Sequence, residues 1–253
     1  MPALDPAFLK IPIAHRALHD ESQGVHENWR SAIVAAIDQG YAIEIDLQLS
    51  SDGRAMVFHD DTLDRLTDKS DDVSDYSAAE LSQIKVGTGQ DVIEPLEDIL
   101  HLIDGKVPLL LELKDQSKQL SRTDGRLEQA IIDALSSYQG PVAVMSFIPH
   151  MIATMANLTS DLPLGLTTGG FMDPTWGIDK EHITHLSQIA DFDPTRYSFV
   201  SHFALELASP RIQWLKEQGT AIFTWTIRSP EAEAIARQTV DNITFEGYLA
   251  AHP

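Results

Sequence analysis

The chain has 253 residues, and 18 lysine and arginine residues stand against 38 aspartate and glutamate residues, which gives a net charge of −20. This balance excludes proteins that bind nucleic acid backbones and argues against stable association with anionic membranes, because both depend on clustered basic side chains. Hydrophobic residues make up 43% of the chain and charged residues 22%, which excludes intrinsic disorder.

The first twenty residues contain two early prolines and an aspartate, and no basic segment followed by an apolar core, so we expect no signal peptide. No run of 18 apolar residues is present to span a bilayer. The chain has no cysteine, which excludes disulfides, thiolate metal sites and cysteine nucleophiles. We therefore expect a soluble, cytoplasmic protein.

Short apolar runs alternate with longer amphipathic segments along the whole chain. The expected strands are Ile11–Ala14, Ala42–Leu49, Val107–Leu113, Val142–Ser146, Leu162–Leu166, Tyr197–Val200, Thr220–Thr226 and Asn242–Phe245. The expected helices between them are Asn28–Gln39, Pro95–Ile103, Asp124–Ser137, Pro149–Leu158, Lys180–Phe192, Ser209–Gln218 and Pro230–Thr239. This alternation predicts an α/β protein with parallel strands, and eight strands in about 250 residues are typical of a (β/α)8 TIM barrel. A doubly wound open sheet is the alternative. No linker divides the chain, so we expect one domain over residues 1–253.

One segment after the second strand interrupts the alternation. Only 12 residues separate Asp46 from His59, and they include the turn sequence Ser51-Asp52-Gly53. A parallel crossover needs about a dozen residues and usually a helix, so an antiparallel hairpin fits better. This hairpin would bring His59 beside Glu44 and Asp46. We expect residues 60–94, which are rich in aspartate, to form an inserted lobe over one end of the barrel, with a short helix near Ala78–Ile84.

Charged residues occur at the carboxyl ends of three expected strands. His15 and Arg16 follow the first strand, and the pairs Glu44/Asp46 and Glu112/Lys114 each have the two-residue spacing that points both side chains to one face. The carboxyl ends of barrel strands converge on the face that holds active sites. Charged groups on an inward face are costly unless they bind an ion or each other.

Together these side chains suggest metal-assisted cleavage of a phosphodiester. The three carboxylates offer the oxygen ligands that Mg²⁺ and Ca²⁺ prefer. Arg16 and Lys114 could bind a phosphate, and His15 and His59 could act as an acid–base pair. The alternative for each residue taken alone is a purely structural role, in which the carboxylates form salt bridges with Arg16 and Lys114. The concentration of such residues at three strand ends favours the functional interpretation.

The order of several motifs makes the prediction more specific. IAHRA, the HEN sequence at 26–28, IEIDLQLSSDG, MVFHDDTLDRLT, PLEDIL and LLLELK follow one another, and MSFIP, FTWTIRSP and VDNITFEG come later. In this combination the chain resembles the glycerophosphodiester phosphodiesterase family, within the phospholipase-C-like phosphodiesterase barrels. The resemblance is dense over Ile11–Lys114.

The resemblance implies a barrel with a small insertion after the second strand, and hydrolysis of a small glycerophosphodiester to glycerol phosphate and an alcohol. It implies that His15 and His59 are the catalytic pair. It further implies that one divalent cation, Mg²⁺ or Ca²⁺, is held by Glu44, Asp46 and Glu112, that Arg16 and Lys114 contact the phosphate, and that Trp225 lies near the substrate. A core position for Trp225 fits its apolar strand equally well. The resemblance does not indicate which histidine is the acid, or whether water attacks directly or a cyclic phosphate forms first.

The sequence departs from the family pattern at two positions. Ala17 stands where glycine is usual, so either this turn needs no left-handed glycine or the loop has shifted. His26 stands where proline is usual. We expect Glu27 and Asn28 to order this loop against Arg16 and the metal site, with helix capping as the alternative for Asn28. The loop at 168–176 could line the alcohol pocket.

Two other functions fit the same residues. The substrate could instead be a lysophospholipid or another phospholipid headgroup, or the protein could bind phosphodiesters without cleaving them. The oligomeric state stays open. Six other histidines lack carboxylate spacing, and we expect capping or surface positions for them: His101, His150, His182, His185, His202 and His252.

Overall fold

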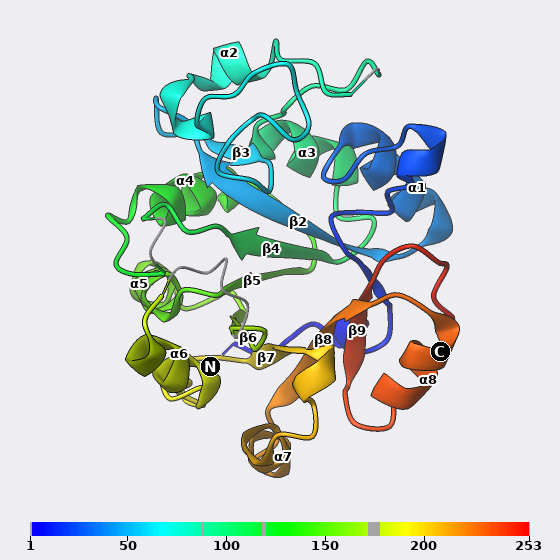
Figure 1. Cartoon of the computed structure of the whole chain (residues 1–253), viewed down its shortest axis with the longest axis vertical. Helices are drawn as coiled ribbons and strands as arrows, with labels where there is room; N and C mark the ends of the chain where they lie inside the picture. Colours follow the sequence, from blue (N-terminus) through cyan, green and yellow to red (C-terminus); the bar gives the residue numbers. More distant parts are fainter. Residues whose placement is uncertain (1, 88, 118–119, 172–177, 253) are drawn as a thin grey trace.

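Eight parallel strands close into a barrel in the computed structural model (Figure 1), which describes residues 2–87, 89–117, 120–171 and 178–252. Each strand pairs with its neighbours in the barrel, and β1 pairs with both β9 and β2, which closes the ring. The predicted (β/α)8 barrel is confirmed, and the open sheet is excluded. The strands are β1 (Ile13–Ala14), β2 (Ala42–Leu49), β4 (Leu109–Leu113), β5 (Val142–Ser146), β6 (Leu164–Thr168), β7 (Phe199–Phe203), β8 (Ala221–Ile227) and β9 (Asn242–Phe245).

Helices surround the strands (Figure 1) and bury their apolar faces against them. The helices are α1 (Arg30–Gln39), α3 (Leu96–Ile103), α4 (Arg126–Leu135), α5 (Pro149–Leu158), α6 (Lys180–Ser187), α7 (Pro210–Glu217) and α8 (Pro230–Ala236). Short 3₁₀ helices are η1 (Pro6–Leu9), η2 (Glu21–Gln23), η3 (Val73–Asp75) and η5 (Ala204–Glu206). The main apolar core lies between this shell of helices and the outward faces of the strands, and both contribute to it.

The expected element boundaries differ from the observed ones for identifiable reasons. β1 begins at Ile13 because Pro12 has no N–H, and the Ile11 N–H donates to the Ala7 carbonyl at 2.9 Å. The helix expected to reach Phe192 ends at Ser187, and Ile189 soon afterwards has a left-handed φ of +50°. β6 and β7 continue two and three residues further than predicted. β6 continues through Thr167 and Thr168, and β7 continues through Ser201 and His202 to Phe203; these polar residues interrupt the apolar pattern that marks a strand.

Apolar side chains fill the barrel interior at the amino-terminal end of the strands. Phe199 and Phe223 lie here with ring centroids 5.0 Å apart, and Phe8 of η1 belongs to the same buried cluster. Gly165 on β6 makes room for this packing, because a Cβ there would lie 2.4 Å from the Phe199 ring. Along β2 and β4, the charged residues Glu44, Asp46 and Glu112 come after the apolar residues that belong to this cluster, Ala42 and Leu110.

The predicted hairpin is confirmed by β3 (Ala55–Val57), which pairs antiparallel with β2. The Phe58 N–H then donates to the Asp46 carbonyl at 3.0 Å, which brings His59 beside the end of β2. Residues 60–94 follow, drawn in cyan at the top of Figure 1, with a helix α2 (Ala78–Leu81) shorter than the expected one. A separate apolar cluster joins this segment to Trp29 and β3.

Candidate active site

A cavity of about 630 Å³ opens at the carboxyl ends of the barrel strands. The structure brings the predicted site residues together here from β1, β2, β3, β4 and β8. Glu44 lies on β2 two residues before Asp46, and it is only 1% exposed. The predicted residues that line the cavity are His15, Arg16, Asp46, His59, Glu112, Lys114 and Trp225.

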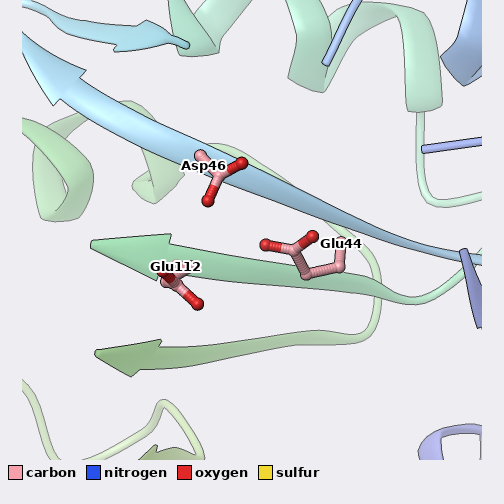
Figure 2. A group of neighbouring side chains, drawn as sticks. All are labelled: Glu44, Asp46 and Glu112. Atoms are coloured by element: carbon pink, nitrogen blue, oxygen red, sulfur yellow. The ribbon is translucent and has the colours of Figure 1, made fainter. Parts of the chain in front are cut away.

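Three buried carboxylates form a cluster at the base of this cavity. Figure 2 shows Glu44 and Asp46 along β2 and Glu112 on the adjacent β4, where Asp46 and Glu112 are register partners. One oxygen from each residue lies within 4.8 Å of the others. Burial, together with the charges of Asp46 and Glu112, raises the pKa of Glu44 well above its usual range. Positive charge close to the cluster would therefore stabilise its ionised form.

Lys114 and Arg16 supply part of this positive charge. Lys114 Nζ lies 2.8 Å from Glu112 Oε1 and 3.3 Å from Asp46 Oδ1, and Arg16 Nε lies 3.5 Å from Asp46 Oδ2. Burial alone would lower the pKa of Lys114, but the charges of Glu112 and Asp46 outweigh it and raise this pKa. Glu44 Oε1 is buried and has no hydrogen-bond partner among the described residues. The salt bridges thus satisfy Asp46 and Glu112, while Glu44 keeps a free oxygen.

Asn28 and Glu27 organise the loop beside this cluster. Asn28 Nδ2 donates to Asp46 Oδ2 at 2.8 Å, and the Asp46 N–H donates to Asn28 Oδ1 at 3.0 Å. The Asn28 side chain therefore positions Asp46, and the N-cap of α1 is Trp29 instead. Arg16 Nη1 donates to Glu27 Oε1 at 2.9 Å. This outcome matches the expected ordering of the loop and excludes the capping alternative for Asn28.

Ala17 adopts the left-handed conformation that glycine would allow freely, with φ of +62°. Of the two alternatives given for this turn, the one in which it needs no left-handed residue is therefore wrong. The Ala17 N–H donates to the Glu44 carbonyl at 2.9 Å, and the Arg16 N–H donates to Glu44 Oε2 at 2.8 Å. These bonds hold the turn against β2 in spite of the Cβ.

This strain predicts an unusual response to Ala17→Gly. Relief of the left-handed conformation is worth about 1–2 kcal/mol, while loss of the buried methyl costs about 0.8 kcal/mol, so we expect equal or slightly higher stability. The matched control is Ala36→Gly, in the middle of α1 and equally buried, which should lower the free energy of unfolding by about 1–2 kcal/mol. Urea unfolding of both variants measures the difference. Equal destabilisation by the two would contradict the strain.

Each candidate catalytic histidine has a carboxylate against Nδ1. His15 Nδ1 lies 2.5 Å from Glu246 Oε2, and His59 Nδ1 lies 2.6 Å from Asp60 Oδ1. Burial lowers the pKa of His15, and the hydrogen bond to Glu246 opposes this only in part. Since both Nδ1 atoms are engaged by carboxylates, Nε2 is the nitrogen of each ring left for proton transfer.

Arg65 of the 60–94 segment ties His59 to the first loop. Its guanidinium lies 2.6 Å from Asp60 Oδ2 and 2.6 Å from Glu27 Oε1. Hydrogen bonds to Glu27 and Asp60 raise the pKa of Arg65, so it stays charged. The lobe therefore contributes directly to the order of the site.

Trp225 forms one wall of the cavity and also packs against other aromatic rings. Its ring centroid lies 5.3 Å from that of Phe147 and 5.1 Å from that of Phe203, and Trp225 Nε1 donates to the Ser201 carbonyl at 3.2 Å. Of the loop at 168–176, residues 172–176 lie outside the described part of the chain. Gly170 lies beside Trp225, since a Cβ there would be 3.4 Å from its ring.

Comparison with known proteins agrees with this geometry. The model of the glycerophosphoryl diester phosphodiesterase family matches residues 15–245. The chain belongs to this family. Family members are hydrolases that cleave phosphodiesters, and the match runs from His15 to the end of β9.

Relatives and solved structures of the family cover almost the whole chain. A glycerophosphodiester phosphodiesterase from Caldanaerobacter subterraneus subsp. tengcongensis is 25% identical over 244 residues, 92% of each chain. A protein of Bacillus subtilis described as a putative glycerophosphodiester phosphodiesterase is 25% identical over 232 residues, 88% of each chain. The structure of an Oleispira antarctica phosphodiesterase, in complex with the product sn-glycerol-3-phosphate, has a TM-score of 0.75 at 24% identity and covers 95% of this chain and 94% of its own. In the described part of this chain, no helix is both long and apolar enough to cross a membrane.

The sequence did not predict Glu246 and Asp60, which bind the two histidines, or Arg228, which lines the cavity. Asp60 directly follows His59, and Glu246 directly follows the last barrel strand, so adjacency and strand-end position were available indications. One histidine prediction is wrong: His202 lies buried on β7, where Nδ1 is 2.8 Å from Thr168 Oγ1. The strand was predicted too short to include His202.

Proposed function

We propose that the protein hydrolyses glycerophosphodiesters to glycerol phosphate and an alcohol. The observation that carries this proposal is the meeting of two carboxylate-bound histidines, two cationic side chains and a carboxylate cluster in one cavity. A phosphodiester needs positive charge around its phosphate and a group to donate a proton to the leaving oxygen. The product held by the Oleispira antarctica protein, sn-glycerol-3-phosphate, supports the same substrate class.

Glu44, Asp46 and Glu112 would hold one divalent cation, Mg²⁺ or Ca²⁺. The donor set fits such an ion, because it consists of carboxylate oxygens within 4.8 Å of one another, and Glu44 Oε1 is buried without a described partner. A cation bound there would supply positive charge to balance the phosphate and the charge that develops on its nonbridging oxygens.

Arg16 and Lys114 would bind the phosphate beside these carboxylates. Their contacts with Asp46 and Glu112 hold the cationic groups at the cavity wall, so little side-chain entropy is lost when the phosphate binds. Of His15 and His59, one would take the proton of the nucleophile and the other would protonate the leaving alkoxide. Trp225 would pack against the substrate.

Residues 1–253 would act as one catalytic domain with the segment 60–94 as an insertion. Arg65 supports this proposal, because it links Asp60 of the segment to Glu27 of the first loop. Removal of the segment would therefore remove Asp60 and Arg65, and with them the carboxylate that binds His59 Nδ1.

A second candidate substrate is a lysophospholipid. Leu120, Phe147 and Ile148 line part of the cavity and would suit an apolar group.

A panel assay tests the proposed function. Purified protein is incubated with glycerophosphocholine, glycerophosphoethanolamine, glycerophosphoglycerol or lysophosphatidylcholine, in Mg²⁺, Ca²⁺ or a chelator, and the released alcohol and phosphate products are measured. We expect the three glycerophosphodiesters to be cleaved in the presence of a cation. Cleavage of the lysolipid alone would favour the second candidate, and binding without cleavage would indicate a phosphodiester-binding protein.

The route of hydrolysis needs its own measurement. Direct attack by water transfers one atom of ¹⁸O from labelled water to glycerol phosphate without an intermediate. Attack by a neighbouring glycerol hydroxyl gives a cyclic phosphate that can be detected at early times. Product analysis during the first turnovers separates the two routes.

A further inference from the structure

Glu246 stands directly after β9 and makes two close contacts with different oxygens. Oε2 lies 2.5 Å from His15 Nδ1, and Oε1 accepts from Arg228 Nε at 2.7 Å. His19 Nε2 lies 3.8 Å from the same oxygen as His15, which is beyond hydrogen-bond distance. Glu246 therefore holds His15 with one oxygen while Arg228 holds the other.

Barrel closure makes this pair possible and keeps it rigid. β1 and β9 are adjacent, with Ala14 opposite Phe245, and the His15 N–H donates to the Phe245 carbonyl at 2.9 Å. His15 and Glu246 are thus the first residues after two paired strands. Arg228 follows β8 at the same end of the barrel and also lines the cavity.

We propose that Glu246 is a positioning residue that keeps the proton of neutral His15 on Nδ1, so that Nε2 is free to exchange a proton with the substrate. Arg228 contributes by fixing which oxygen of Glu246 faces the histidine. This inference rests on the proposed function, since it assumes that His15 transfers a proton. Neither residue belongs to the carboxylate cluster, to the phosphate contacts or to the hydrogen bond between His59 and Asp60.

The chemistry of the pair supports this assignment. A carboxylate can only accept a hydrogen bond, so the neutral ring must donate from Nδ1. Burial by itself raises the pKa of Glu246, but the hydrogen bond from His15 and the charges of His15 and Arg228 outweigh it and lower this pKa. Glu246 is therefore ionised at neutral pH and remains an acceptor.

Glu246→Gln tests the proposal, because Arg228 determines which way the new amide group points. Arg228 donates and cannot accept, so it should retain the amide oxygen and turn the amide NH₂ toward His15. His15 Nδ1 must then accept, which moves the proton to Nε2. We expect kcat to fall by about 10²- to 10⁴-fold, as for other histidines held in the wrong tautomer, with KM changed by less than about threefold.

The double variant Glu246→Gln with Arg228→Ala provides the decisive comparison. Without Arg228 the amide can turn and present its oxygen to His15, so the double variant should recover at least about tenfold of the kcat lost in Glu246→Gln. Arg228→Ala alone is the reference for the contribution of Arg228 to substrate binding. A merely structural role for Glu246 predicts the opposite, namely a double variant no better than the single one.

Nitrogen NMR of ¹⁵N-histidine-labelled protein reads the tautomer of His15 without any need for turnover. We expect a proton on Nδ1 in the wild type and on Nε2 in Glu246→Gln. An unchanged tautomer, or an unchanged kcat in an active enzyme, would overturn the inference and leave the proposed function intact. A wild type that cleaves no glycerophosphodiester would overturn the proposed function instead, and the assignment of Glu246 to catalysis would fall with it.

Discussion

Replacement of His15 or His59 by alanine is expected to lower kcat for glycerophosphodiester hydrolysis by about 10²- to 10⁴-fold, the usual contribution of a positioned acid or base. Each ring lines the cavity with Nδ1 bound to a carboxylate, so alanine removes a proton-transfer group while the surrounding strands keep their hydrogen bonds. The loss in the double variant should be much smaller than the product of the single losses, because the two histidines would act on one reaction. Steady-state kinetics with saturating substrate measure the effect.

His185→Ala is the matched control for these variants. His185 is an exposed histidine on α6 that pairs with Asp191, and it does not line the cavity. We expect its kcat to stay within about twofold of wild type. Circular dichroism and thermal unfolding show whether the variants keep the fold. Near-normal turnover by both His15→Ala and His59→Ala would contradict the proposed catalytic pair.

Removal of divalent cations is expected to abolish activity and to lower the melting temperature. A ligand present at 100 times its dissociation constant stabilises the native state by about 2.7 kcal/mol, which for a chain of this size corresponds to a shift of about 5–10 °C. The physical reason is that Lys114 and Arg16 pair with only two of the three carboxylates, while the third, Glu44, lies within 4.8 Å of the other two in a buried site. Differential scanning calorimetry with a chelator, and then with added Mg²⁺ or Ca²⁺, measures the shift.

Glu44→Gln separates the cation from other sources of stability. Without cation, this variant should be more stable than the wild type, because it loses a buried charge that faces two others. With cation, it should gain much less than the wild type. Glu128→Gln is the control, since Glu128 is equally buried but lies on α4 outside the cluster. A cation-induced shift that is equal in all three proteins would place the ion elsewhere.

Strand order and type could be predicted well from the sequence, while several boundaries could not. β2, β5 and β9 have the bounds that their apolar runs predict. β7 extends through Ser201 and His202 because its hydrogen bonds continue along β6 and β8 whatever the side chains are. A run of apolar residues indicates a strand that is buried in the core. The ends of barrel strands carry polar residues that are buried at the active site, so the apolar pattern stops before the strand does.

The candidate site was predictable as far as local spacing reaches. A period of two places Glu44 beside Asp46 and Glu112 beside Lys114, and the short hairpin predicts the return of His59. The left-handed conformation of Ala17 was not predictable, because alanine gives no indication of it and the hydrogen bonds to Glu44 impose it. Likewise the contact of Asn28 with Asp46 depends on how the first loop folds onto β2.

The acidic excess noted first in the sequence has a partial structural explanation. Three carboxylates form the buried cluster, and two more, Asp60 and Glu246, hold the histidines. A small phosphodiester can therefore be bound in a strongly acidic protein, provided that Arg16, Lys114 and a cation reverse the field locally.

By itself, the sequence determined which residues share a strand face and at which strand ends charge accumulates, because the two-residue period of a strand is a local property. Only the tertiary structure decided which ends meet. His15 and Glu246 are 231 residues apart, and they touch because the first and last strands of the barrel pair and close the ring. Closure of the barrel depends on the packing of all its strands, so it cannot be predicted from any local sequence pattern.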